Sequence, residues 1–262
     1  MPSAATALRR MNVLGLATMV LLLGLWEVLV RSGLLDFQNL PAPSAVAMHG
    51  KDLVATGELP EHLLHTVRVT LLGWLLACGL GLGLGLLLGL WQPAWRWSMA
   101  SLELLRAVPP ISLVPLALLV FGFSIRTELT LIVYASAWPV LVNTIEGVRT
   151  LRPELHDVAR MLQLSRLTTL RKIILPAATP AIVVGLQLAL SLALVLAVVA
   201  ELVGNPAGLG NALILAQLAL RPEEMFAYVF TIGLLGITLN AALRQLVART
   251  LPSSRPALEK AQ

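Results

Sequence analysis

Six long apolar stretches alternate with shorter polar segments along the chain. They cover about residues 12–30, 67–91, 99–122, 128–145, 181–203 and 225–247. A hydrocarbon core of about 30 Å requires roughly 20 mostly apolar residues in helical form. The stretches are continuously apolar rather than alternating, which favours helices over the strands of a membrane barrel. The pattern therefore predicts an all-α, polytopic membrane protein with six transmembrane helices.

The composition agrees with lipid as the main surroundings of the chain. Of the 262 residues, 57% are hydrophobic and 13% are charged, whereas soluble domains carry about 25% charged residues. No linker or low-complexity tract divides the sequence, so residues 1–262 are expected to form a single transmembrane domain. The first stretch is long for a signal peptide and no clear cleavage site follows it, so we expect it to be retained as a helix.

The basic residues predict the orientation in the membrane. With a cytoplasmic N-terminus, 13 of the 19 Lys and Arg residues fall on the cytoplasmic side and five on the outer side, and Arg106 lies inside the third stretch. Cytoplasmic loops are enriched in Lys and Arg, so both termini are expected in the cytoplasm. The net charge of +5 therefore indicates membrane orientation, and no nucleic-acid partner is expected.

Residues that would indicate catalysis or metal binding are sparse. Cys78 is the single cysteine, and the four histidines are scattered, so neither a disulfide nor a metal site is predicted. The sequence contains no HExxH motif, no nucleophile elbow and no carboxylate pair on one intramembrane face. We therefore expect no catalytic residue in this chain.

Three glycines of the second stretch, Gly81, Gly85 and Gly89, recur at every fourth position. A phosphate-binding loop would require a Gly-Lys-Ser/Thr ending, which is missing. The spacing instead predicts a face on which two transmembrane helices approach closely. The chain is accordingly not expected to hydrolyse ATP itself.

Two segments between the apolar stretches are too long for simple connectors. Residues 31–66 lie outside by the charge count and contain Leu40-Pro41-Ala42-Pro43-Ser44, followed by a pattern that fits a short surface helix. Residues 146–180 lie inside, carry six basic residues and show helical periodicity. Loops longer than about 12–15 residues are usually functional or disordered, and the periodicity favours a function.

The inner segment is predicted to form two short helices joined by a turn. Pro153 can begin the first helix, Ser165 can cap the second, and Pro176 is expected to end it. The predicted apolar faces comprise Leu155, Val158, Ala159 and Leu162 in the first helix, and Leu167, Leu170, Ile173 and Ile174 in the second. The residues alone leave two alternatives open, namely docking into a groove on a partner protein or lying on anionic lipid.

This segment resembles the EAA loop of ABC importer permeases, which has the pattern E-A-A, three residues, Gly, nine residues and I-x-L-P. Asp157-Val158-Ala159 occupies the triplet, and Ile173-Ile174-Leu175-Pro176 falls at the expected spacing. Gln163 stands where the pattern has glycine, so we expect a differently built turn or weaker docking. The resemblance assigns coupling to an ATPase to Asp157, Val158, Ala159, Gln163, Ile173, Leu175 and Pro176.

The flanking residues are similar to the nitrate/sulfonate/taurine group of binding-protein-dependent permeases. The shared segments are Leu40 to Ser44, Arg106-Ala107-Val108-Pro109-Pro110, Gly147-Val148-Arg149, Arg152-Pro153, Ala200-Glu201 and Gly208-Leu209-Gly210. The resemblance implies a type I ABC importer permease of the bacterial inner membrane that pairs with a second permease copy. Its other partners would be cytoplasmic ATPases, which bind ATP and Mg²⁺, and a periplasmic or lipid-anchored substrate-binding protein. No cofactor is implied for this chain.

The same resemblance implies a small anionic solute such as an aliphatic sulfonate, taurine or nitrate. A pyrimidine-type organic precursor is the alternative within the family. An ion-gradient-driven secondary transporter is less consistent with the sequence, because the centres of the apolar stretches are almost free of charge. A membrane scaffold without transport activity is the remaining alternative.

Four residues are candidates for the pathway or its gate. Arg106 lies three residues after Glu103, so the two can share a helix face, either as a structural pair or in contact with substrate. Pro109 and Pro110 are expected to kink or break the third helix, because proline removes a backbone donor. Glu201 is expected at the outer end of the fifth helix, either at the mouth of the pathway or as a carboxylate solvated at the headgroups.

Overall fold

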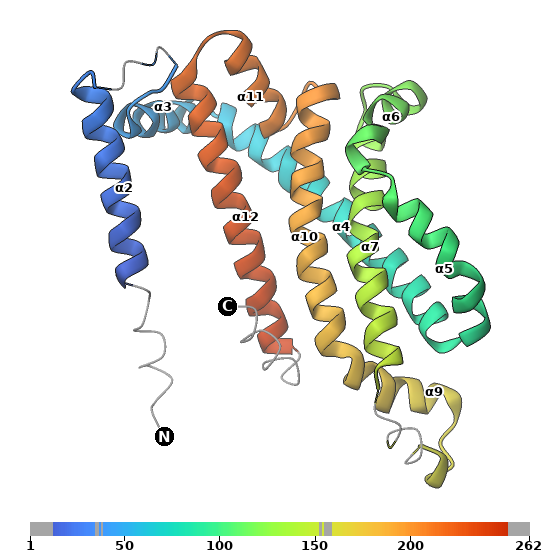
Figure 1. Ribbon diagram of the computed structural model, residues 1–262. Helices are drawn as coiled ribbons and strands as arrows, with labels where there is room; N and C mark the ends of the chain where they lie inside the picture. Colours follow the sequence, from blue (N-terminus) through green and yellow to red (C-terminus); the bar gives the residue numbers. More distant parts are fainter. Residues whose placement is uncertain (1–12, 35–36, 38, 152–153, 155–158, 251–262) are drawn as a thin grey trace. The chain divides into compact units, whose positions relative to one another are not determined.

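The computed structural model describes residues 13–34, 37, 39–151, 154 and 159–250, and these residues contain helices and turns but no strands (Figure 1). The chain divides into two compact units, Met1–Pro60 with Ala212–Phe230 and Glu61–Asn211 with Thr231–Gln262. Each unit is described by itself below. The expectation of a single domain stays a prediction.

The smaller unit contains helix α2 (Val13–Arg31) and helix α3 (Pro43–Thr56). The Glu27 carboxylate of α2 accepts hydrogen bonds from the Ser44 amide at 3.0 Å and from the Ser44 hydroxyl at 2.7 Å. Pro43 occupies the first turn of α3, where its missing amide costs no helical bond. The proline-rich segment therefore begins a helix whose first turn is capped by a side chain of α2.

Four of the described helices are long and apolar enough to cross a membrane. They are α4 (Glu58–Leu90), α7 (Ile125–Arg149), the run Arg166–Gly204 and α12 (Pro222–Thr250). A bent pair of helices makes a fifth span if it is counted as one, and the shorter α11 (Leu209–Leu218) is also apolar. The first expected span corresponds to α2, which is not among these helices, so its crossing of the membrane stays a prediction.

The third apolar stretch is broken as its prolines predict. Helix α5 (Gln92–Ala107) ends before Pro109, and the 3₁₀ turn η1 (Pro110–Leu113) leads into α6 (Val114–Phe121). The two halves are bent by 77°. The hydroxyl of Tyr134 on α7 donates to the carbonyl of Leu105 at 2.5 Å. Part of the backbone at the end of α5 is thus satisfied by a neighbouring helix, because proline supplies no amide there.

The glycine face of α4 packs against α7, as the spacing predicts. A Cβ added at Gly81, Gly85 or Gly89 would lie 2.6–2.9 Å from side-chain carbons of α7. Gly185 of the run Arg166–Gly204 makes a similar approach, with the carbonyl oxygen of Pro139 2.8 Å from its added Cβ. These contacts bring three helix backbones close together in the larger unit.

Two predicted boundaries are wrong. Helix α4 begins at Glu58, within the predicted loop 31–66, because the polar residues before the apolar stretch are helical as well. Pro176 does not end a helix, since α9 (Arg166–Thr169), the π-helical η2 (Leu170–Ile174) and α10 (Leu175–Gly204) form one run. Pro176 lies in the first turn of α10, where its missing amide is tolerated after the π-helical turn.

Candidate functional site

The segment predicted to couple to an ATPase folds as a hairpin, defined here as residues 159–175, beside the start of α10 (Figure 1). Ser165 caps α9 by accepting the Thr168 amide at 3.3 Å, which confirms the predicted cap. Ala159 and Ile174 are buried, Ile173 and Leu175 are half-buried, and Pro176 is exposed. Pro153, Asp157 and Val158 lie outside the described residues.

Gln163 forms the turn of the hairpin in a left-handed conformation, with a φ of 46°. Its amide donates to the Arg160 carbonyl at 3.0 Å, and the Leu164 amide donates to the Ala159 carbonyl at 3.1 Å. This pair of bonds is the Schellman motif, whose left-handed position is usually glycine. Gln163 therefore adopts a conformation that glycine reaches at lower cost, and the predicted weakening of docking stays a prediction.

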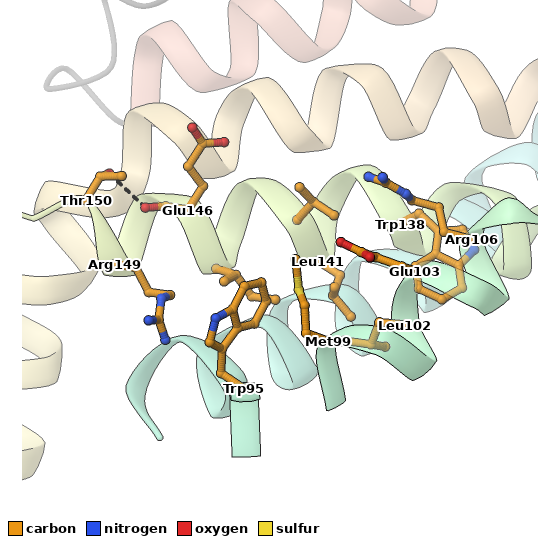
Figure 2. Close-up of a pocket in the computed structure, with 12 residues that line it drawn as sticks. Trp95, Met99, Leu102, Glu103, Arg106, Trp138, Leu141, Glu146, Arg149 and Thr150 are labelled. Carbon is orange, nitrogen blue, oxygen red and sulfur yellow. Dashed lines mark hydrogen bonds between the residues drawn. The ribbon is translucent and has the colours of Figure 1, made fainter. Parts of the chain in front are cut away.

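A groove lies between α5 and α7, with a cavity volume of about 280 Å³ (Figure 2). Most of its lining side chains are apolar, and they include Met99, Leu102 and Leu141. Arg106 and Glu103 line one end, as Figure 2 shows. At the other end, the Arg149 guanidinium lies 5.0 Å from the ring centroid of Trp95. The groove thus combines an apolar floor with a guanidinium group at each end, and the carboxylates of Glu103 and Glu146 also line it.

The structure brings three of the four candidate pathway residues together. Arg106 lines the groove, and Pro109 and Pro110 form the break that directly follows α5. Glu201 lies elsewhere, near the C-terminal end of α10. Its side chain is fully buried, with 0% exposure, so it is not the headgroup-solvated carboxylate that the sequence left open. Its role in a pathway stays a prediction.

The Glu201 carboxylate fixes the start of α11. It accepts the Thr66 hydroxyl at 2.8 Å and the Gly210 amide at 2.9 Å, while the Thr66 hydroxyl oxygen accepts the Leu209 amide at 2.9 Å. Two amides of the first helical turn are thereby satisfied by side chains. Gly208 has a φ of 95° and lies against the carboxylate, where any Cβ would overlap it. The Ala-Glu and Gly-Leu-Gly segments therefore belong to one capping arrangement.

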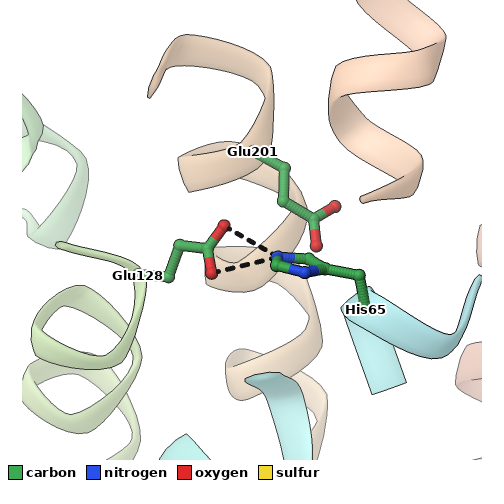
Figure 3. Close-up of side chains that lie close together, drawn as sticks. All are labelled: His65, Glu128 and Glu201. Atoms are coloured by element: carbon green, nitrogen blue, oxygen red, sulfur yellow. Dashed lines mark hydrogen bonds and ion pairs between the residues drawn. The ribbon is translucent and has the colours of Figure 1, made fainter. Parts of the chain in front are cut away.

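A second buried carboxylate belongs to Glu128, which is in the first turn of α7 and lies beside Glu201 of α10. Its two oxygens lie 3.3 Å from Nε2 of His65 on α4, and it also accepts the Asn205 side-chain amide. Figure 3 shows the His65, Glu128 and Glu201 side chains pointing toward one another. These three residues are called the His-Glu-Glu cluster below.

The sequence did not predict His65, Thr66 or Glu128 as functional residues. Their contact partners lie far away in sequence, because His65 and Glu128 are 63 positions apart and Thr66 and Glu201 are 135 positions apart. The available signal was that Glu128 begins one predicted span and Glu201 nearly ends another, so that both are expected on the outer side of the membrane. The two helices also had to be neighbours for the carboxylates to meet.

Comparison with known proteins places the chain in a family. Residues 81–255 match the family described as "Binding-protein-dependent transport system inner membrane component". The chain belongs to this family. A putative aliphatic sulfonates transport permease protein SsuC of Bacillus subtilis is 33% identical over 90% of this permease and 86% of the relative. The nitrate import permease protein NrtB of Leptolyngbya laminosa is 31% identical over 58% of this permease and 55% of that protein.

The fold of the permease is shared with solved ABC importer structures. A chain of the MetNI methionine ABC transporter, solved in inward-facing conformations, has a TM-score of 0.54 at 16% identity. The match covers 68% of this permease and 92% of that chain. The predicted all-α, type I ABC importer permease fold is thus confirmed, and the chain is a multi-pass permease subunit of an ABC importer.

Proposed function

We propose that the permease couples to a cytoplasmic ATPase through the exposed tip of its hairpin. The observation that carries the proposal is the exposure of three large apolar side chains there, Met161 at 84%, Leu162 at 64% and Leu167 at 57%. In water, such side chains favour burial against another surface. They lie on both sides of the Gln163 turn, so a single groove on a partner can receive them.

The basic residues of the hairpin are also exposed and flank the apolar tip. Arg160, Arg166, Arg171 and Lys172 are all open to solvent, and they suit acidic groups around the mouth of a groove. Anionic lipid would attract the same residues. The capped turn favours a protein partner, because it holds the apolar side chains in one fixed arrangement at the tip of a loop.

The solute proposed for the permease is a small anion such as an aliphatic sulfonate, taurine or nitrate. The names of the SsuC and NrtB relatives support this class. The groove between α5 and α7 offers the Arg106 and Arg149 guanidinium groups at opposite ends to an anion, and the Glu103 and Glu146 carboxylates line the same groove. A pyrimidine-type precursor is the alternative, and an uncharged solute of that kind would not require either guanidinium.

The remaining assembly follows the same family pattern. We infer a pair of permease copies, with one ATPase subunit docked on each hairpin. The ATPase subunits bind ATP and Mg²⁺, and a binding protein delivers the solute from outside. Both termini of the permease and the hairpin would then face the cytoplasm, in agreement with the excess of Lys and Arg on that side.

Coupling is tested with Leu167→Glu, which places a charge within the apolar tip, and with Leu167→Met as the volume-conserving control. Each variant is expressed in the native host, and the ABC ATPase that co-purifies with it is quantified. We expect at least a tenfold loss for Leu167→Glu and near-normal recovery for Leu167→Met, with equal amounts in the membrane fraction. Unchanged recovery for Leu167→Glu would exclude docking through the tip.

The solute is tested separately by ATP-dependent uptake in proteoliposomes that contain the complex and its binding protein. Sulfonate, nitrate and pyrimidine compounds are compared in wild type and Arg106→Gln. Loss of anion uptake in Arg106→Gln with normal ATPase recovery is the expected result. Saturable uptake of only an uncharged compound would contradict the anion proposal and leave the coupling result unaffected.

A further inference from the structure

The His-Glu-Glu cluster places three metal-ligating side chains from three helices at one point. One ligand atom from each of His65, Glu128 and Glu201 lies within 4.8 Å of the other two. We propose that these residues bind a divalent metal cation, and that Zn²⁺ is the cation best suited to them. The scattered histidines predict no metal site, but the fold joins residues that no short motif connects.

The charge of the cluster is the first argument for a cation. Glu128 and Glu201 are 1% and 0% exposed, and burying two ionised carboxylates next to each other is costly without a positive partner. Among the described residues, His65 is the one basic side chain within ion-pair distance of either carboxylate, and it carries a charge only when its imidazole is protonated. Arg68, which lies nearby on α4, is exposed. A divalent ion between the carboxylates would offset both charges.

The second argument is that the hydrogen bonds around the cluster orient its oxygens. The Thr66 hydroxyl and the Gly210 amide fix the Glu201 carboxylate, and the Asn205 side-chain amide, whose nitrogen also lies 3.4 Å from Nε2 of His65, holds Glu128. Among the described residues, Thr66 is the one hydrogen-bond donor to Oε1 of Glu201, which leaves this oxygen a lone pair for a metal. Outer partners of this kind are typical of metal ligands.

The donor set favours Zn²⁺. One imidazole nitrogen with two carboxylate oxygens combines a ligand that Zn²⁺ binds readily with oxygen ligands that it also accepts. Three protein ligands leave a fourth tetrahedral position for water. A pocket of about 340 Å³ borders Glu201 and is lined by Phe123, Asn205 and Asn211, among others. Glu201 is the cluster residue that lines this pocket, so an ion would have to enter the cluster from the Glu201 side.

A bound ion would join the ends of α4, α7 and α10 that lie away from the hairpin. These helices contribute one ligand each, so separating them would require breaking a coordination bond. The proposed role is therefore a structural clamp on this end of the three-helix core. It does not rest on the proposed ATPase docking or on the identity of the solute.

The test uses the full-length permease, purified in detergent, stripped with a chelator and titrated with Zn²⁺ by calorimetry at constant pH. We expect one Zn²⁺ per chain, with protons released because the ligands must be deprotonated to bind. His65→Gln and Glu128→Gln should each weaken binding at least tenfold. His49→Gln and Glu61→Gln change an exposed histidine and an exposed glutamate, and both should bind like wild type.

Several results would overturn the proposal. They are a wild-type chain without stoichiometric Zn²⁺ binding, normal binding in His65→Gln, or an equal loss in the two controls. If the cluster variants do not fold, X-ray absorption of the Zn²⁺-loaded wild type decides the question. One imidazole nitrogen with oxygen neighbours is expected there, and a sulfur or a second imidazole in the first coordination sphere would refute the assignment.

Discussion

The close approach of α4 to α7 is tested by adding one methyl group on each face of α4. Gly81→Ala places the methyl toward α7, whereas Gly83→Ala places it on the opposite, exposed face. The Cβ at position 81 would lie 2.7 Å from the Val140 Cβ and 2.9 Å from the Ala137 carbonyl oxygen. The Cβ at position 83 would have no atom within 4 Å. The two variants therefore differ in packing and share the same helix.

The size of the effect follows from this geometry. Carbon atoms in ordinary contact are about 3.5–4.0 Å apart, so the helices must separate by about 1 Å, and the Ala137 backbone oxygen cannot rotate away. Overpacking of this kind costs about 1–3 kcal/mol. Replacing glycine by alanine inside a helix returns about 0.5–1 kcal/mol. Because both variants gain the second contribution, their difference of about 1–3 kcal/mol reports the packing alone.

The assay is thermal or denaturant-induced unfolding of the purified permease in the same detergent, followed by tryptophan fluorescence. Gly83→Ala should unfold at or slightly above the wild-type midpoint, and Gly81→Ala clearly below it. Gly79→Ala and Gly85→Ala repeat the comparison at the neighbouring positions, since Gly79 also meets open space and Gly85 meets Thr144 at 2.6 Å. If Gly81→Ala and Gly85→Ala were as stable as Gly79→Ala and Gly83→Ala, the close packing of α4 on α7 would be refuted.

Three further substitutions probe the turn and the capping arrangement by the same unfolding assay, with hydrogen exchange for the first. Gln163→Gly should slow exchange in the hairpin, because it removes about 1 kcal/mol of left-handed strain, whereas Gln163→Ala should not. Gly208→Ala should lower the free energy of unfolding by about 1–3 kcal/mol more than Gly57→Ala does, since φ is 95° at Gly208 and 85° at Gly57 but only position 208 faces a buried carboxylate; equal losses would contradict this. Thr66→Val should cost about 1–3 kcal/mol by leaving the first amide of α11 unpaired, whereas the exposed Thr130→Val should change stability by less than about 0.5 kcal/mol.

Features with local causes could be predicted from the sequence. The glycine spacing of α4, the break at Pro109 and Pro110 and the Ser165 cap each depend on residues within one or two helical turns. Helix starts and ends were less predictable, because apolarity marks the part of a helix that meets lipid. The helix itself can extend further, and α4 does so from Glu58.

The buried cluster could not be predicted, because its partners meet only through the fold. Glu201 alone has the appearance of an ordinary carboxylate at a helix end. Its burial depends on Thr66 from α4 and on Gly208, whose lack of a side chain leaves room for the carboxylate. The resemblance to a permease group included both the Ala-Glu and the Gly-Leu-Gly segments without connecting them, and the structure shows that the Glu201 carboxylate accepts the Gly210 amide.

The larger unit connects the hairpin to the His-Glu-Glu cluster through α7 and α10. The helical run Arg166–Gly204 begins within the hairpin and nearly ends at Glu201. Gly147 and Gly185 hold α7 and α10 in close contact at two levels, so the two helices resist sliding past each other. The π-helical η2 lies at the base of the hairpin, where a wider turn allows a change of direction more easily than an α-helix does. If a partner binds the hairpin as proposed, its movement would act first on η2 and then on a helix pair whose far end is held by the hydrogen bonds of the buried carboxylates.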